Sequence, residues 1–149
     1  MEAVTSNGTA KSVVQDPELT HGTIGCHSLP DPRKFYEEKL HLRCVQHAPV
    51  AQLIVGSCEF GIACVRAGNK LPTQGRENHW VITVPDTVTV AEMHADLESS
   101  DFVRELEPLL TENGVASFMV QNDDSIWWRV TNLTEAHYHA LFEKGDVAA

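Results

Sequence analysis

Hydrophobic and polar residues alternate along several short stretches of the chain, and this two-residue period is typical of half-buried β-strands. In the first stretch, His21 and His27 share one face with the other odd-numbered residues, whereas Ile24 and Cys26 face the opposite side. Similar patterns follow at positions 43–47, 51–56, 60–66, 78–84, 115–121 and 125–131. The chain is therefore predicted to be rich in short strands.

Two internal segments have a helical spacing instead. The first covers residues 32–40, where Asp31 is a suitable N-cap and a proline occupies the first helical position. The second is a long helical region from Val90 to Asn113, with a break expected near Asp101 and at Glu107-Pro108. Helices and strands thus occur in one α+β domain.

The order of these elements predicts two units, each with the βαβββ order. The predicted parts are a flexible arm at 1–17 and one domain at 18–149, with unit one at 19–67, a linker at 68–76, unit two at 77–132 and a terminal helix at 134–144. Only two strands follow the long helical region, so the second unit is expected to lack one strand. Pro72 and Gly75 support a linker between the units.

The acidic composition excludes two classes of partner. The chain has 149 residues and a formal net charge of −10, and its pI is near 5.1. Such a chain offers no basic surface for nucleic acid or for an anionic membrane. We also expect no membrane span and no signal peptide, and therefore a cytoplasmic protein. The cysteines form no C-x-x-C pair and are interpreted as reduced thiols.

Two histidines open corresponding strands of the two units. His79 follows His21 by 58 residues, which is about the length of one unit. Two imidazoles at equivalent positions suit either a transition metal or acid–base chemistry near neutral pH. The alternative is that each histidine only binds backbone or water at a sheet edge, but the matched pair favours a functional site.

The sequence resembles the vicinal oxygen chelate superfamily, which includes glyoxalases, extradiol dioxygenases, fosfomycin-resistance enzymes and bleomycin-binding proteins. The resemblance is carried by His21 with the F-Y-E-x-x-L-x-L run at 35–42, by the strand at 78–84, and by D-D-S-I-W-W-R-V at 123–130, which is similar to the closing hairpin D-G-N-W-W-E-I. It covers about residues 19–131. It implies two βαβββ units that form a cupped, incomplete mixed β-barrel flanked by helices.

The resemblance also implies a metal site, and the chain departs from it at one position. The family pattern would place His21, His79 and a glutamate of the last strand around a divalent ion such as Fe, Mn, Zn or Ni. Here Arg129 replaces the glutamate, and a guanidinium cannot bind a metal ion. Either another residue completes the site, or the site holds no metal and Arg129 anchors a substrate oxygen. The candidates for a substitute ligand are Glu59, Glu77, Glu135, His137 and His139.

Several further residues are predicted to contact substrate from the same faces. They are Thr23, His27, His47, Val81, Phe118 and Trp127. For His27 a structural role in a hydrogen bond is the stronger interpretation, and His47 fits a turn equally well. No nucleotide cofactor is expected.

Two functions follow from these residues and from the resemblance. The first is a glyoxalase-like or dioxygenase-like enzyme, of isomerase, lyase or ring-cleavage type. It would act through His21, His79 and Arg129 on an oxygen-rich, aromatic or polyketide-like substrate of secondary metabolism. The second is a metal-free protein that binds and sequesters a small molecule, as in the bleomycin-resistance branch. The resemblance further implies a homodimer, in which the cup is completed across two chains.

Overall fold

The structure is a computed structural model that describes residues 13–14, 16–57, 60–68, 71–133 and 136–148, and the side chains of 136–138 are not described. Most of the predicted arm at 1–17 lies outside these ranges. The same holds for Glu59 and Glu135 and for the side chain of His137, which were candidate ligands. Among the described residues, no helix is long and apolar enough to cross a membrane.

The first unit has the predicted βαβββ order. Its elements are β1 (His21–Cys26), α1 (Pro30–Lys34), η1 (Phe35–Lys39), β2 (Arg43–Ala48), β3 (Ala51–Val55) and β4 (Gly61–Arg66). The four strands form a mixed sheet with the order β1-β4-β3-β2, in which β1 and β4 are parallel. The helix starts before the predicted N-cap Asp31, and its last turn widens to a π-helix, where Leu40 N donates to Phe35 O at 3.1 Å.

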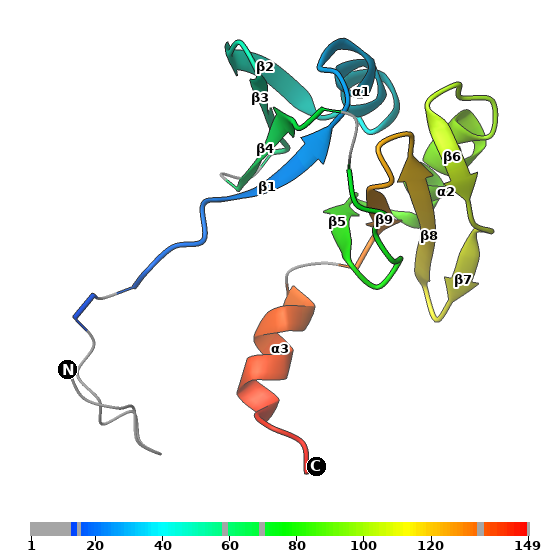
Figure 1. The fold of residues 1–149 in the computed structure, drawn as a ribbon. Helices are drawn as coiled ribbons and strands as arrows, with labels where there is room; N and C mark the ends of the chain where they lie inside the picture. Colours follow the sequence, from blue (N-terminus) through cyan, green and yellow to red (C-terminus); the bar gives the residue numbers. More distant parts are fainter. Residues whose placement is uncertain (1–12, 15, 58–59, 69–70, 134–135, 149) are drawn as a thin grey trace.

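The second unit repeats this architecture. Its elements are β5 (His79–Thr83), α2 (Thr87–Leu97), β6 (Val103–Leu106), β7 (Leu110–Glu112), β8 (Val115–Asn122) and β9 (Trp127–Thr131). The sheet order is β5-β9-β8-β6, with β7 also paired to β8 and with β5 parallel to β9. The terminal helix α3 (Ala136–Lys144) extends away from both sheets (Figure 1).

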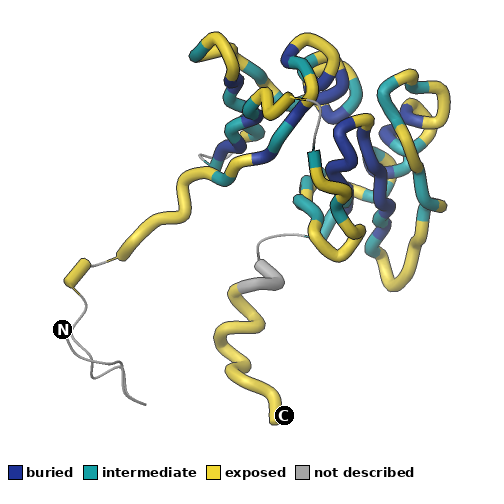
Figure 2. The backbone as a smooth tube through the Cα atoms, in the orientation of Figure 1, coloured by how far each residue is buried: buried dark blue, intermediate teal, exposed yellow. Residues whose placement is uncertain are grey.

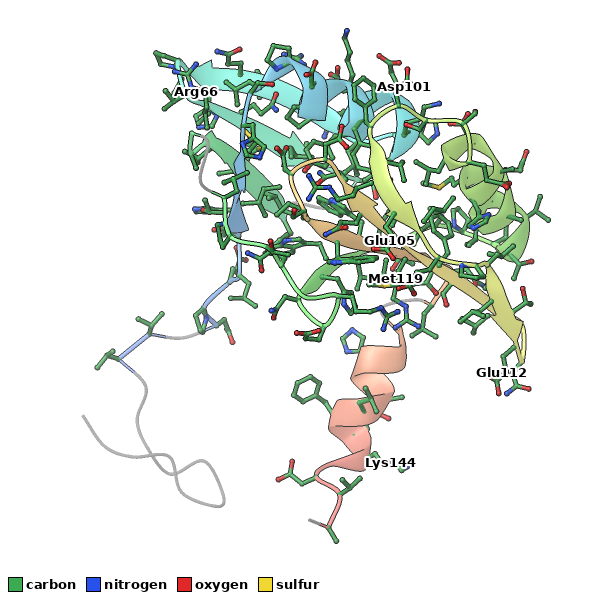
Figure 3. The ribbon with its side chains drawn as sticks, turned by 45° about the vertical axis from the view of Figure 1, so that its right-hand side comes forward. Arg66, Asp101, Glu105, Glu112, Met119 and Lys144 are labelled. Atoms are coloured by element: carbon green, nitrogen blue, oxygen red, sulfur yellow. The ribbon has the colours of Figure 1, made fainter. Side chains whose placement is uncertain are left out.

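The prediction that the second unit lacks a strand is wrong. The helix α2 ends at Leu97, and residues 103–112 form β6 and β7, which both run antiparallel to β8. Glu105 and Glu112 mark these two halves of one interrupted strand (Figure 3). The interruption is at Pro108, whose ring nitrogen has no hydrogen for the strand ladder. The predicted long helix therefore ends early, and a third strand is present.

One hydrophobic core joins the two units. The helix-facing sides of both sheets pack around the helices. The core formed in this way includes Ile24, Cys26, Phe35, Tyr36, Val90, Met93, Leu97, Phe118, Val120, Trp128 and Val130. Buried residues accordingly concentrate on the strands and on these helices, whereas residues 139–144 of α3 are exposed (Figure 2). The rings of Tyr36 and Trp128 meet edge to face across the two units, with centroids 5.3 Å apart.

A buried amide fixes the junction between the units. The Asn122 side chain donates to the Tyr36 hydroxyl at 3.0 Å, and its oxygen accepts from the backbone N–H groups of Asp124 and Ile126, each at 3.0 Å. Asp124 in turn accepts from the backbone N–H of His27 at 3.0 Å. These bonds hold the end of β1, the helix of the first unit and the β8–β9 turn in one arrangement.

We predict that Asn122→Ala destabilises the protein by about 2–4 kcal/mol, because it leaves several buried polar groups without partners. Urea denaturation followed by circular dichroism measures this change. The matched control is Asp123→Asn in the same turn, which is exposed and should change stability by less than about 0.5 kcal/mol. Equal effects of the two substitutions would show that the amide is not the anchor of the junction.

Candidate functional site

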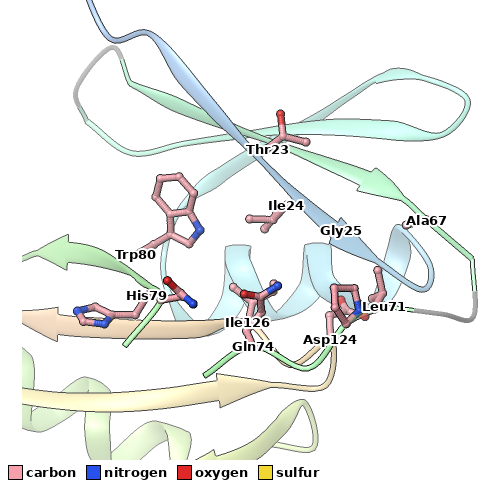
Figure 4. A pocket seen from close by; sticks show the side chains of 12 residues that line it. Thr23, Ile24, Gly25, Ala67, Leu71, Gln74, His79, Trp80, Asp124 and Ile126 are labelled. Carbon is pink, nitrogen blue, oxygen red and sulfur yellow. The ribbon is translucent and has the colours of Figure 1, made fainter. Parts of the chain in front are cut away.

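A cavity lies where the edge of β1 meets the segment that precedes β5. It has a volume of about 680 Å³, with apolar walls that include Ile24, Trp80 and Ile126. Polar side chains are Thr23, Gln74, Asn78, His79 and Asp124. Figure 4 shows that these residues come from both units. A large apolar pocket with a few polar groups is the usual form of a small-molecule site.

Trp80 can form this wall because a glycine faces it. A Cβ atom at Gly22 would lie 2.5 Å from the Trp80 ring, so any larger residue would displace the ring. Trp80 points toward β1, whereas the ring of the preceding His79 points away from it (Figure 4). This alternation follows from the strand geometry of β5. His79 is therefore at the boundary between the cavity and the other face of the second sheet.

Asp124 is the buried acid of the cavity. Its side chain is only 5% exposed, and burial raises the pKa of its carboxyl, although the bond from the His27 N–H opposes this shift. Among the described residues, no cationic side chain lies within ion-pair distance of it. The Asp124 carboxyl therefore keeps its proton to a higher pH than a solvent-exposed aspartate does.

The imidazole of His79 has a defined tautomer. Its Nδ1 lies 2.8 Å from the backbone oxygen of Arg76. A carbonyl oxygen can only accept a hydrogen bond, so Nδ1 carries the hydrogen. In the neutral ring, Nε2 then has a free lone pair and can accept a proton or bind a metal.

A second recess places His79 beside Arg129. It has a volume of about 210 Å³, and Arg76, Glu107, Met119 and Arg129 line it together with His79. The strand register explains this grouping. Arg129 of β9 pairs with Met119 of β8 on one side and with Val81 of β5 on the other. Val81 is two residues after His79 in β5, so their side chains share one face of the sheet. Arg76 is bonded to Glu107, whereas Arg129 has no carboxylate within ion-pair distance among the described residues.

His21 lines a different pocket. This hollow of about 280 Å³ lies on the side of the first sheet that faces away from the helices, and it contains His21, His47 and Leu53. The Nδ1 atom of His21 lies 3.0 Å from the hydroxyl of Thr20, a group that can donate or accept, so its tautomer is not fixed. The structure thus brings Thr23 and His79 to one cavity and His21 and His47 to another.

Three other predicted contact residues have clear positions. Val81 is 44% exposed on the face of His79, and Trp127 is buried on that face opposite His79. Nδ1 of His27 donates to the backbone oxygen of Gly68 at 3.0 Å, and His27 also lines a hollow of about 210 Å³, so its contact with substrate stays a prediction.

Phe118 is among the residues that line the recess of His79 and Arg129, but its ring packs on the helix side of the sheet. Its ring is 2% exposed and packs edge to face with His94 of α2, with centroids 5.0 Å apart. Its neighbour Met119 is the residue that pairs with Arg129. The sequence could not separate the two faces, because β8 is a central strand that is largely buried on both sides.

Comparisons with known proteins connect this geometry to a known fold. No family model matches the sequence, and no curated protein matches it either. The structure is similar to the fosfomycin resistance protein FosX of Listeria monocytogenes, with a TM-score of 0.68 and 14% identity over 82% of this chain and 98% of that one. The structure of oxidase ChaP-H2 matches with a TM-score of 0.65 and 9% identity, over 80% of this chain and 96% of that one. Lactoylglutathione lyase from Agrobacterium tumefaciens matches with a TM-score of 0.57 and 16% identity, over 78% of this chain and 95% of that one.

The chain has the vicinal oxygen chelate fold. The similarity covers nearly the whole of each compared structure, and it confirms the architecture expected from the two histidine-led strands and the closing hairpin. At these identities the likeness concerns the vicinal oxygen chelate fold alone.

The side chains do not fit the divalent metal that the resemblance implies for the vicinal oxygen chelate fold. Arg129 brings a permanent positive charge to the face of His79, where the pattern requires a carboxylate. Among the described residues, no three histidine, cysteine, aspartate or glutamate side chains converge on one point. Glu77 lines the recess beside His79 but does not complete such a group.

Three residues of the site were missed from the sequence. Asp124 was assigned only to a turn, and its burial depends on the distant N–H of His27. Arg76 was placed in a linker, and Glu107 in a helix break. Their contact crosses 31 residues, and no local pattern indicates it.

We predict that Asp124→Asn stabilises the protein at neutral pH and that this gain disappears in acid. The pKa of Asp124 is raised above 3.8, so the folded state binds the proton more tightly than the unfolded state. The stability that this group contributes is present below 3.8 and is lost as the pH rises through the raised pKa. Asparagine keeps an oxygen for the His27 N–H but never becomes charged.

The measurement is the difference in unfolding free energy between wild type and variant, taken from about pH 3 to pH 7. The difference should grow in favour of the variant across that range. A difference that is constant, or that shrinks with rising pH, would contradict a buried carboxyl with a raised pKa.

Proposed function

We propose that this protein is a small-molecule enzyme of isomerase or lyase type that uses His79 and Arg129 on an oxygen-rich, aromatic or polyketide-like substrate. The observation that carries the proposal is the free Nε2 of His79 on the sheet face that also bears the guanidinium of Arg129. A base beside a fixed positive charge suits the removal of a proton next to a carbonyl group.

The proposed reaction is a proton transfer. Nε2 of His79 takes a proton from the carbon next to a substrate carbonyl, and the C–H bonding electrons move to the carbonyl oxygen. Arg129 stabilises the resulting oxyanion through its N–H groups. Return of the proton from His79 to another atom of the substrate completes an isomerisation, whereas loss of a neighbouring group completes an elimination. Val81, which is 44% exposed on the face of His79, would hold the apolar part of the substrate.

We further propose that the active cup is formed by two chains. The faces that carry His21 and His79 both lie away from the shared core, and the two rings line separate pockets. The His21 face also exposes apolar surface, with Val45 56% exposed. A homodimer in which the His21 face of one copy covers the His79 face of its partner would bury this surface. We also propose that the protein is located in the cytoplasm.

A second function is favoured by Arg129. A permanent cation in the recess beside His79 also suits a protein that only binds and sequesters an anionic small molecule. FosX is named a resistance protein, and the other two structures are named an oxidase and a lyase, so the names of the neighbours support both a protective and a catalytic function.

We predict that the protein accelerates exchange of carbon-bound hydrogen for deuterium in aromatic 1,2-dicarbonyl and β-keto ester compounds, as measured by NMR in heavy water. His79→Asn should slow the exchange by about 10²- to 10⁴-fold, because the base is removed. Arg129→Gln should slow it by about 10²- to 10³-fold, because the oxyanion loses its charge partner.

The matched control is Arg66→Gln, since Arg66 lies at the end of β4 in the other sheet (Figure 3). This variant should keep the wild-type exchange rate. If the protein binds these dicarbonyl and β-keto ester compounds without any hydrogen exchange, the second function, binding and sequestration, is favoured. Exchange that is unchanged in His79→Asn would exclude His79 as the base.

We predict that chains carrying His21→Asn and chains carrying His79→Asn are each inactive and regain activity when they are unfolded and refolded together. In a dimer with shared cups, half of the refolded dimers contain one intact cup, so about a quarter of the wild-type activity should return. Sites formed within single chains would give no recovery. Full activity of His21→Asn alone would remove His21 from the site.

A further inference from the structure

Arg76 contacts two functional elements at once. Its guanidinium forms two hydrogen bonds to the carboxylate of Glu107, from Nε to Oε2 at 2.7 Å and from Nη2 to Oε1 at 2.6 Å. Its backbone oxygen accepts the bond from Nδ1 of His79 at 2.8 Å. The same residue therefore attaches its segment to the second sheet and sets the orientation of the imidazole.

The other end of this attachment is held on three sides. The backbone N–H of Glu107 donates to Met119 O at 2.9 Å, and its carbonyl accepts from Nε2 of His94 on α2 at 2.9 Å. The next residue is Pro108, which separates β6 from β7. Glu107 thus stands at the interruption of the strand, where its backbone is bonded both to β8 and to the helix.

The turn that carries Arg76 is short and closed. The backbone N–H of Asn78 donates to the carbonyl of Gly75 at 3.0 Å, so the peptide groups between them have little freedom. The direction of the Arg76 carbonyl follows from this turn and from the position of the Arg76 side chain. Release of the guanidinium would leave only the turn to hold the carbonyl against His79.

We propose that Arg76 and Glu107 form a positioning pair that holds His79 in the tautomer with hydrogen on Nδ1 and a free Nε2. The importance of this tautomer for a reaction rests on the proposed function, but the tautomer itself does not. In the absence of this bond, an imidazole in water favours the opposite tautomer, in which Nε2 carries the hydrogen and cannot act as a base.

The pair acts locally and not as a general source of stability. The side chains of Arg76 and Glu107 are 56% and 29% exposed, and ion pairs at such positions add little to global stability. Their attraction is also screened by salt. Loss of the pair should therefore leave the protein folded while it changes the state of His79.

The experiment determines the tautomer of His79 in the 149-residue chain labelled with ¹⁵N-histidine. Two-bond ¹H–¹⁵N correlations in NMR spectra show which ring nitrogen carries the hydrogen. The signals of His79 are those that disappear in His79→Asn. The wild type should show hydrogen on Nδ1. Arg76→Gln and Glu107→Gln should each move the population toward hydrogen on Nε2. The exchanged pair, Arg76→Glu with Glu107→Arg, should restore part of the wild-type population.

The matched control is Glu37→Gln, which removes the same charge from another exposed ion pair, that of Arg33 with Glu37 at 3.3 Å. It should leave the His79 signals unchanged. Sodium chloride at about 1 M should shift the wild type toward the Glu107→Gln spectrum and leave that variant unaffected. The urea midpoint of every variant shows that the fold is retained.

Two results overturn the inference. One is a wild-type His79 with hydrogen on Nε2, and the other is a Glu107→Gln spectrum that matches the Glu37→Gln control. A different failure concerns only the proposed function. If Arg76→Gln changes the tautomer and deuterium exchange continues at the wild-type rate, the positioning pair stands and His79 is not the base.

Discussion

The buried contact between the two units is the constraint on which the rest of the structure depends. Tyr36, Asn122 and Asp124 connect the helix of the first unit, the β8–β9 turn and the end of β1 through hydrogen bonds that are withdrawn from water. Because the helix-facing sides of both sheets share the same core, the opposite sides, with His21 and His79, point away from it. The cavity of about 680 Å³ lies at this junction, and Asp124 is part of its lining.

Most of the fold could be predicted because its first unit has simple alternation. In β1 the buried residues Ile24 and Cys26 alternate with more exposed ones, and the sequence shows this period directly. The second unit is different between Leu97 and Val115. There Phe102, Leu106 and Leu109 are spaced like residues on one side of a helix, although they belong to an interrupted strand and its flanks. A register shift near Val103 and the break at Pro108 change the alternation, so a local pattern could not identify the strand.

The candidate site could be predicted only where one residue type determines the proposed chemistry. His79 and Arg129 were recognised because an imidazole at a strand opening and a guanidinium in place of a carboxylate change what the site can bind. Asp124 and the Arg76–Glu107 pair were not, because their properties arise from residues far along the chain. The burial that raises the pKa of Asp124 is created by packing of the units and has no signal in the turn itself.

The same junction explains why a second copy is the simpler way to complete the site. To face His21 toward His79 within one chain, the units would have to separate, and this would break the bonds of Asn122 to Tyr36 and of Asp124 to His27. Each buried bond that is left unmade costs about 1–3 kcal/mol, and the apolar core between the units would also be exposed. Association of two chains requires none of these losses, and it covers apolar surface around Val45 and Val81 that is open in the single chain. Packing energetics therefore support the proposal that the cup is shared between two copies.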